Sequence, residues 1–150
     1  MTTPFSNVYD QFMMLVDDYN LITLFNTSVV DFETYLSGFL IPAITDFYNC
    51  NQVLTYSLGV FTETLSVDNI KVLAKLMKKY WLEREVSNIT QMRLHVQDKD
   101  FKTFAEANNL ATKEKVYSDY KEEMSQMLVD YGMNNRAMWQ SFLNGNFYTP

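Results

Sequence analysis

Apolar and polar residues follow one another with helical spacing along most of the chain, and the clearest example starts at Ser66. The Ser66 side chain is a suitable helix N-cap, and Asp68 places negative charge in the first turn. Leu65 and Ile70 lie on either side of this start, where a hydrophobic staple would fix the direction of the incoming chain. These signals predict a helix that begins at Val67.

The apolar positions after this start fall on one face of the predicted helix. They are Ile70, Leu73, Ala74, Met77 and Trp81, whereas Lys71, Lys75, Lys78 and Lys79 lie mostly away from that face. We predict a helix to about Leu82, followed by a less regular helical region from Glu83 to Val96. The candidate core residues here are Ile70, Leu73, Met77 and Trp81, with Phe101 and Phe104 farther along.

Two helices are predicted before this region. The first begins near Thr3 and Pro4, since proline is tolerated in a first turn, and its apolar stripe is Phe5, Val8, Tyr9, Phe12, Leu15, Val16 and Tyr19. The second begins at a capping-box pattern, Ser28 to Asp31, and its stripe is Phe32, Leu36, Phe39, Ala43 and Phe47. Pro42 is expected to kink this helix or to end its first part.

The last long helix is predicted from Leu110 to Tyr131, after a capping signal at Asp98 or Asp100. Its apolar stripe is Leu110, Val116, Tyr117, Tyr120, Met124, Met127, Leu128 and Tyr131. Gly132 is placed to be the residue that ends it.

Between Cys50 and Leu65 the pattern changes to β-branched and aromatic residues around Ser57, Leu58 and Gly59. We predict a short β-hairpin or extended loop over about 51–65, supported by the helices or by another subunit because an isolated ribbon is marginal in water. The candidate contact residues of this loop are Tyr56, Leu58, Val60 and Phe61. The fold class is therefore all-α, a compact bundle of four to five helices with this excursion.

The chain has 150 residues, of which 47% are hydrophobic, and this favours one helical domain over 1–131. The remaining segment, 132–150, is too rich in bulky apolar residues for a solubilising tail, and we expect it to be an extended C-terminal docking tail. Its candidate contact residues are Met138, Trp139, Phe142, Leu143, Phe147 and Tyr148. Docking on another chain, docking on its own domain and fraying all remain open.

Charge is distributed unevenly along the chain. Residues 1–70 carry eight acidic residues and no Lys, Arg or His, whereas residues 71–150 carry twelve Lys or Arg and ten acidic residues. The acidic half should repel a nucleic-acid backbone, so direct DNA binding is disfavoured. It could be a solvated face, a surface that contacts a neighbour's lysine face, or a lining past which DNA slides.

Little in the sequence indicates catalysis. The single His95 lies near Asp98 and Asp100, but this cluster by itself does not predict a metal site. The pairs Asp17 with Asp18 and Glu83 with Glu85 do not face each other on a helix, so solvated charge is the better interpretation. The four glycines are scattered singly, and the lone Cys50 is best read as a small hydrophobic thiol. We predict no enzyme, no cofactor and no metal site.

Three segments in the second half carry a resemblance to a known family. They are Trp81 to Asn88, Asp100 to Phe104 and Ala107 to Leu110, and the run from Phe32 to Leu36 leading to Ala43, Ile44 and Phe47 fits as well. In these segments the chain resembles the small head-tail connector proteins of tailed bacteriophages, also called neck, adaptor or head-completion proteins. The resemblance covers roughly Asp31 to Tyr131. Arg84 stands where a helix-ending proline is expected, so the sequence departs from the family there.

The resemblance implies a structural virion protein, made in the host cytoplasm and located in the neck between head and tail. It would form a ring of about twelve copies beneath the portal protein, contact other neck or tail proteins, and continue a channel through which DNA passes without specific binding. No membrane is involved, because no apolar run approaches the ~20 residues needed to span one. The alternatives are a soluble helical regulator that binds one partner protein, and a metal-dependent hydrolase, which stoichiometric bound metal would reveal.

Overall fold

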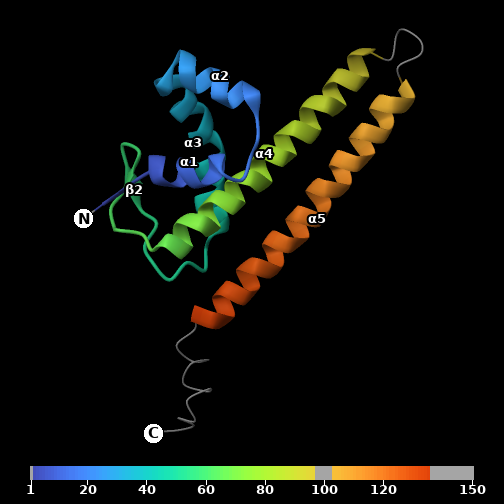
Figure 1. The fold of residues 1–150 in the computed structure, drawn as a ribbon. Coiled ribbons are helices and arrows are strands. Elements are labelled where there is room, and N and C mark those ends of the chain that lie inside the picture. The colour runs from blue at the N-terminus through green and yellow to red at the C-terminus, as the bar shows by residue number, and fades with distance from the viewer. Residues whose placement is uncertain (1, 97–102, 136–150) are drawn as a thin grey trace, which may run out of the picture.

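A computed structural model describes residues 2–96 and 103–135 of the chain. Over these residues it contains five helices and three very short strands (Figure 1). The helices are α1 (Ser6–Met13), α2 (Tyr19–Thr27), α3 (Val29–Asp46), α4 (Val67–Val96) and α5 (Thr103–Asn135), and the strands are β1 (Thr3–Pro4), β2 (Tyr56–Ser57) and β3 (Val60–Phe61). The predicted helical bundle with a small hairpin is thus confirmed.

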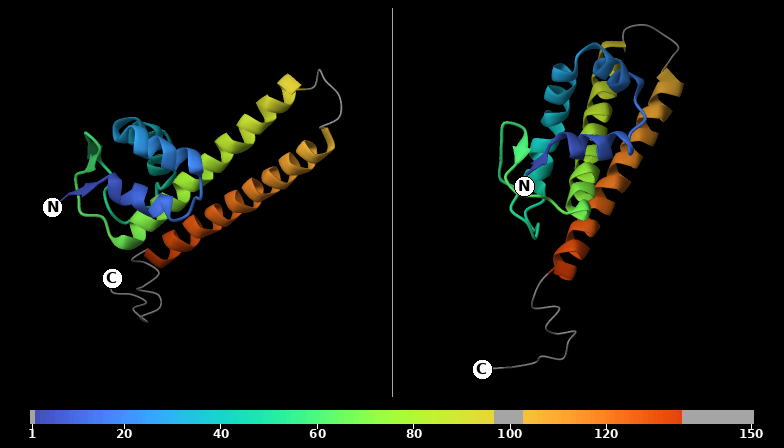
Figure 2. Two further views of the ribbon diagram at one scale, coloured as in Figure 1. Left: turned by 45° about the horizontal axis from the view of Figure 1, so that its top comes forward. Right: turned by 60° about the vertical axis from the view of Figure 1, so that its left-hand side comes forward.

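Helix α4 is the centre of the arrangement. Helices α1 and α3 pack against one side of α4, α5 runs antiparallel along another, and α2 packs on α3 (Figures 1 and 2). The C-terminal half of α4 and the N-terminal half of α5, which lie side by side, extend beyond the other helices (Figure 1). Because α4 is covered from two sides, it must bury more than one narrow stripe.

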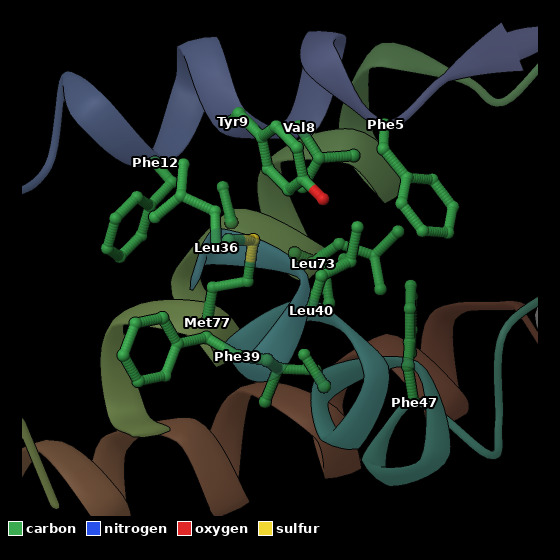
Figure 3. Packing of buried hydrophobic residues seen from close by; sticks show 14 of the residues in the cluster. Phe5, Val8, Tyr9, Phe12, Leu36, Phe39, Leu40, Phe47, Leu73 and Met77 are labelled. Atoms are coloured by element: carbon green, nitrogen blue, oxygen red, sulfur yellow. The ribbon is translucent and has the colours of Figure 1, made fainter. Parts of the chain in front are cut away.

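The burial pattern of α4 reflects this central position. Leu73, Ala74 and Met77 are buried as predicted, and Ile70 and Trp81 are partly buried against the same core. Val72 and Leu76 are also buried, which the single predicted stripe did not include. Figure 3 shows side chains from α1, α3 and α4 converging between the ribbons. Phe101 and the side chain of Phe104 lie outside the described residues.

Helix α4 starts where the sequence signals predicted, but its regular part is longer than predicted. The Ser66 hydroxyl oxygen accepts a hydrogen bond from the Asn69 backbone N–H at 3.2 Å, and Leu65 is buried beside it. The predicted irregularity after Glu83 is wrong, because the helix continues without interruption to Val96. Arg84 lies within this helix with its guanidinium 4.7 Å from the centre of the Tyr35 ring. Packing on α3 and α5 therefore stabilises a segment whose own periodicity is weak.

The predicted first helix, from Phe5 to Tyr19, is divided in two. Helix α1 ends at Met13, and α2 begins at Tyr19 after an extended Asp18 whose carboxylate accepts from the Asn20 backbone N–H at 2.8 Å. Its predicted start was also too early, since Thr3 and Pro4 form a strand. The Asp18 cap gives α2 its own N-terminus, and the apolar spacing across 5–19 concealed this break.

Helix α3 follows its predicted start closely. The Ser28 hydroxyl oxygen accepts from the Asp31 backbone N–H at 3.2 Å, and Phe32, Leu36, Phe39 and Ala43 are buried. Pro42 does not end the helix, which continues to Asp46. The buried Leu40 and Ala43, before and after Pro42, hold the helical path, so tertiary packing outweighs the missing amide donor.

Helix α5 is longer at both ends than the predicted range from Leu110 to Tyr131. Leu110 and Met124 are buried, Tyr120 is partly buried, and Val116 is half-exposed although it was assigned to the apolar stripe. Gly132 lies inside the helix and does not end it. A single neighbour, α4, covers most of α5, so only a narrow stripe of it is buried. Asp98 and Asp100, the proposed capping signal, lie outside the described residues.

The predicted hairpin over about 51–65 is present, and a third strand, β1, pairs with it. Strands β2 and β3 pair antiparallel, and β1 pairs with the other edge of β3, so that Thr3 is opposite Phe61. The two turn residues, Leu58 and Gly59, have φ values of 50° and 76°. Positive φ at both positions is the geometry of a tight two-residue hairpin turn. The Gly59 carbonyl accepts from the Phe5 backbone N–H at 2.9 Å, which fixes the turn to the start of α1.

Candidate docking surfaces

The hairpin turn presents the most exposed large apolar side chain of the described residues. Leu58 is 99% exposed, and Tyr56 next to it is 41% exposed. Val60 is half-buried, and Phe61 is fully buried with its ring centre 4.8 Å from that of Phe5. Of the four loop residues predicted to contact a partner, Phe61 thus belongs to the core of its own domain. Tyr56 is partly exposed with its ring centre 5.2 Å from that of Phe5, and Leu58 faces outward.

A groove of about 400 Å³ lies beside this turn, between the start of α1, the hairpin and α3. Tyr9 and Glu33 line it together with Leu58 and Gly59. Burial, with a further contribution from the charge of Glu33, raises the pKa of Tyr9 to about 12. The Tyr9 hydroxyl donates to the Glu33 backbone carbonyl at 3.4 Å. The hydroxyl therefore stays neutral and acts as a fixed donor, which is a structural role.

A second apolar surface covers α2 and the start of α3. We call it the α2 patch, and it consists of Tyr19, Ile22, Phe25, Val29 and Val30, all exposed. Phe25 packs edge-on against Phe32 at 5.1 Å between ring centres, so the patch is continuous with the core beneath it. The sequence interpretation missed this surface because it assigned no helix to 20–27. The cap residue Asp18 followed by the apolar run from Leu21 to Phe25 was the signal that would have found it.

The positive charge of the second half is concentrated on α4, and much of it is used inside the domain. Lys79 forms an ion pair with Asp46, and the Tyr80 hydroxyl donates to the same carboxylate at 2.7 Å. Burial alone would raise the pKa of Asp46, but these two hydrogen bonds and the Lys79 charge hold it below its usual value. Lys78 lies 5.2 Å from the centre of the Tyr120 ring. Of the four lysines of the predicted polar face, Lys79 is thus used in an ion pair and Lys78 contacts a ring.

Two lysines near the C-terminal end of α1 are available for contacts with another molecule. Within the described part of the chain, Lys71 and Lys75 form no ion pair, and they flank a groove of about 280 Å³ between α1 and α4. Ala74 lines this groove together with Met14 and Leu15, and Gln11 completes it. Met14 is 77% exposed. An apolar groove bordered by two cations is suited to an aliphatic side chain that lies next to carboxylates.

A cluster of polar side chains holds the end of α5 to the loop after α3. The Asn49 amide donates to the Leu128 carbonyl at 2.5 Å. The Tyr131 hydroxyl accepts from the Asn51 backbone N–H at 3.2 Å and lies 2.6 Å from the amide oxygen of the buried Asn69. These contacts hold the last turns of α5 against the loop after α3. The tail residues Met138, Trp139, Phe142, Leu143, Phe147 and Tyr148 lie outside the described residues.

The residues considered for catalysis have structural or solvent-facing positions. Asp18 caps α2, and Glu83 is exposed on α4. Burial raises the pKa of the Cys50 thiol, which packs against the core. Among the described residues, no group of three or more His, Cys, Asp or Glu side chains is placed to hold a metal ion. The side chain of His95, with Asp98 and Asp100, lies outside that part.

Comparisons of the chain with family models, with curated proteins and with solved structures found no match. A search of the described residues for a helix long and apolar enough to cross a membrane also found none.

Proposed function

We propose that this protein is a structural component of a tailed-phage virion that forms a ring between the portal and the tail. The observation that carries the proposal is that bulky apolar side chains are exposed in separate places around a core that is otherwise closed. Leu58 projects from the hairpin turn, and the α2 patch lies on a different element. Exposed apolar surface of this kind is typical of protein contacts. The resemblance of the sequence to head-tail connector proteins supports ring neighbours, the portal and neck proteins as the partners in these contacts.

A ring also agrees with the placement of charge. The helices α1 to α3 carry acidic residues and no bases. Among the described residues, Asp46 is the one of these acids that forms an ion pair, and its partner is Lys79 of α4. Different surfaces on one chain that attract each other give heterologous contacts, which close into rings when the rotation between copies allows it. An acidic inner surface would repel the DNA backbone, so DNA would pass through the channel without binding.

The energetics favour many weak contacts over one strong contact. Burying a leucine or phenylalanine side chain contributes roughly 1.5 to 3 kcal/mol, whereas association costs about 4 to 15 kcal/mol in lost freedom. A ring holds its subunits close together, so each later contact forms at high effective concentration. We therefore propose a monomer or weak oligomer in dilute solution that assembles on its partner.

The test is assembly with the portal protein of the same phage, whose gene we expect to lie beside this one. We expect electron microscopy of the co-purified proteins to show a ring of this chain on the portal. Deleting 136–150 leaves all of α5 in place and should keep helicity and melting temperature nearly unchanged while abolishing the joining. Phe25→Ser, which alters an exposed side chain of the α2 patch, tests a second surface in the same assay.

The matched control is Lys115→Ser, an exposed position on α5 away from both apolar surfaces, which should assemble normally. A tight dimer without any partner, or a one-to-one complex with a single soluble protein, would contradict the ring and favour the regulator. Unfolding of the truncated chain would show that the tail belongs to the domain core.

A further inference from the structure

We propose that Leu58 of one copy inserts into the groove formed by Met14, Leu15 and Ala74 of the next copy. We call this groove the α1–α4 groove. The inference rests on the proposed ring, and it names the two surfaces through which neighbouring subunits meet. The occupant of the groove is thus a second copy of this chain.

Leu58 is an unusual residue for its position. A two-residue hairpin turn with positive φ at both positions favours Gly, Asn or Asp at the first, because Gly has no Cβ and Asn and Asp tolerate positive φ better than a bulky apolar residue does. Leu58 has a φ of 50° and is almost completely exposed. The position therefore carries both backbone strain and an unburied aliphatic side chain. Neither stabilises the isolated domain, and both are explained if Leu58 is buried in a contact.

The α1–α4 groove has matching properties. The small side chain of Ala74 lines it from below and is itself fully buried. Met14 and Leu15 form one wall, and both are exposed apolar residues of the short segment between α1 and α2. Methionine adapts its shape to an incoming side chain, which suits a contact surface.

The two surfaces lie at opposite ends of α1. The hairpin turn is bound to the start of this helix through the hydrogen bond from Phe5 N–H to the Gly59 carbonyl. Met14 and Leu15 follow its last residue, Met13. Eight residues of helix separate the ends by about 12 Å. A projection at one end and a groove at the other give a contact between unlike surfaces, so each copy can bind one neighbour on either side.

Charge is complementary between the two ends. Glu33 lines the groove beside Leu58, and Glu63 follows β3 on the hairpin, whereas residues 1–70 contain no base. The α1–α4 groove is flanked by Lys71 and Lys75. Bringing Leu58 into this groove brings carboxylates toward ammonium groups, which favours this pairing over contact between two hairpins.

Site-directed cross-linking in the full-length chain tests the contact. Two single-cysteine variants, Leu58→Cys and Met14→Cys, are made in a Cys50→Ser background, because Cys50 is the only natural cysteine. At concentrations where the protein self-associates, we expect oxidation of the mixture to give a disulfide between unlike variants. Each variant alone should remain largely unlinked, since like surfaces do not meet. Asn88→Cys, at an exposed α4 position elsewhere, is the control partner and should not link to Leu58→Cys.

A second measurement avoids cysteines. Leu58→Asn favours the turn geometry but removes the aliphatic group, whereas Leu58→Met retains an apolar side chain. We expect Leu58→Asn to weaken self-association measured by sedimentation about 30-fold per contact, equivalent to ~2 kcal/mol, and Leu58→Met to change it only slightly. Lys71→Glu combined with Lys75→Glu should weaken association as well.

The outcomes separate this contact from the ring itself. If rings form on the portal but the unlike cysteines do not link and Leu58→Asn associates normally, the contact is wrong and the proposed function stands. Links between two Leu58→Cys chains would also overturn it, because they indicate hairpin-to-hairpin contact. If the chain forms no ring with the portal, the proposed function itself fails.

Discussion

The extent of α5 can be tested through Gly132, which lies inside the helix and next to Asn49. An ideal Cβ built on Gly132 would lie 2.7 Å from the Asn49 amide nitrogen. That nitrogen donates to the Leu128 carbonyl, so the absence of a side chain at 132 leaves room for the hydrogen bond. Gly132→Ala is therefore expected to have two opposing effects on the free energy of unfolding.

The two effects have comparable size. Alanine stabilises a helix interior by about 1 kcal/mol relative to glycine. Displacing Asn49 costs about 1 to 3 kcal/mol, because its amide loses a hydrogen bond in a partly buried place. In the natural chain, Gly132→Ala should thus be neutral or destabilising by up to ~2 kcal/mol. In an Asn49→Ala background the displacement disappears, and the same change should stabilise the protein by about 1 kcal/mol.

The assay is a double-mutant cycle from urea unfolding followed by circular dichroism. The expected coupling between positions 49 and 132 is about 1 to 3 kcal/mol. Equal stabilisation by Gly132→Ala in both backgrounds would refute the contact with Asn49. Equal destabilisation in both would instead indicate that Gly132 ends the helix in a left-handed conformation, as the sequence alone predicted.

Two further predictions concern pH. The lowered pKa of Asp46 means that its charged form stabilises the folded state above the unfolded pKa of about 3.9, and this contribution is lost as pH falls. Asp46→Asn should therefore lower the free energy of unfolding near pH ~7 by about 1 kcal/mol, and this difference from wild type should shrink below pH ~4. The control Asp10→Asn, at an exposed position, should differ little from wild type. A difference between Asp46→Asn and wild type that stays constant with pH would contradict this. Tyr9, with its pKa raised to about 12, stabilises the fold fully below pH ~10 and loses this contribution as pH rises further. Urea unfolding at stepped alkaline pH should show wild type losing more stability than Tyr9→Phe, and parallel losses would disprove the role of this hydroxyl.

Local signals in the sequence determined the starts of α3 and α4 and the hairpin. Ser28 and Ser66 act as N-caps where they were predicted, because a capping side chain needs only the backbone N–H groups that follow it. The two-residue turn at Leu58 and Gly59 also lies within the predicted excursion. Such features depend on neighbours a few residues away, so a sequence is sufficient to locate them.

Helix ends and exposed surfaces were decided by tertiary structure. Helix α4 continues through Arg84 because the guanidinium packs on Tyr35 of α3, and α3 continues through Pro42 because Leu40 and Ala43 are buried in the core. Gly132 remains helical beside Asn49, a residue far away in the sequence. Each of these outcomes depends on contacts between distant segments, which periodicity does not report.

The same distinction holds for the candidate docking surfaces. Composition predicted that a loop around Tyr56 and Leu58 would make contacts, but not that Phe61 would be taken into the core. The acidic first half was visible in the sequence, whereas the use of Lys79 by Asp46 and the availability of Lys71 followed only from packing. The sequence by itself determined which side chains the chain carries, where α3 and α4 begin, and where the hairpin turn lies. Only the tertiary structure decided which apolar and charged groups were left facing outward, because burial is a property of the whole packed domain.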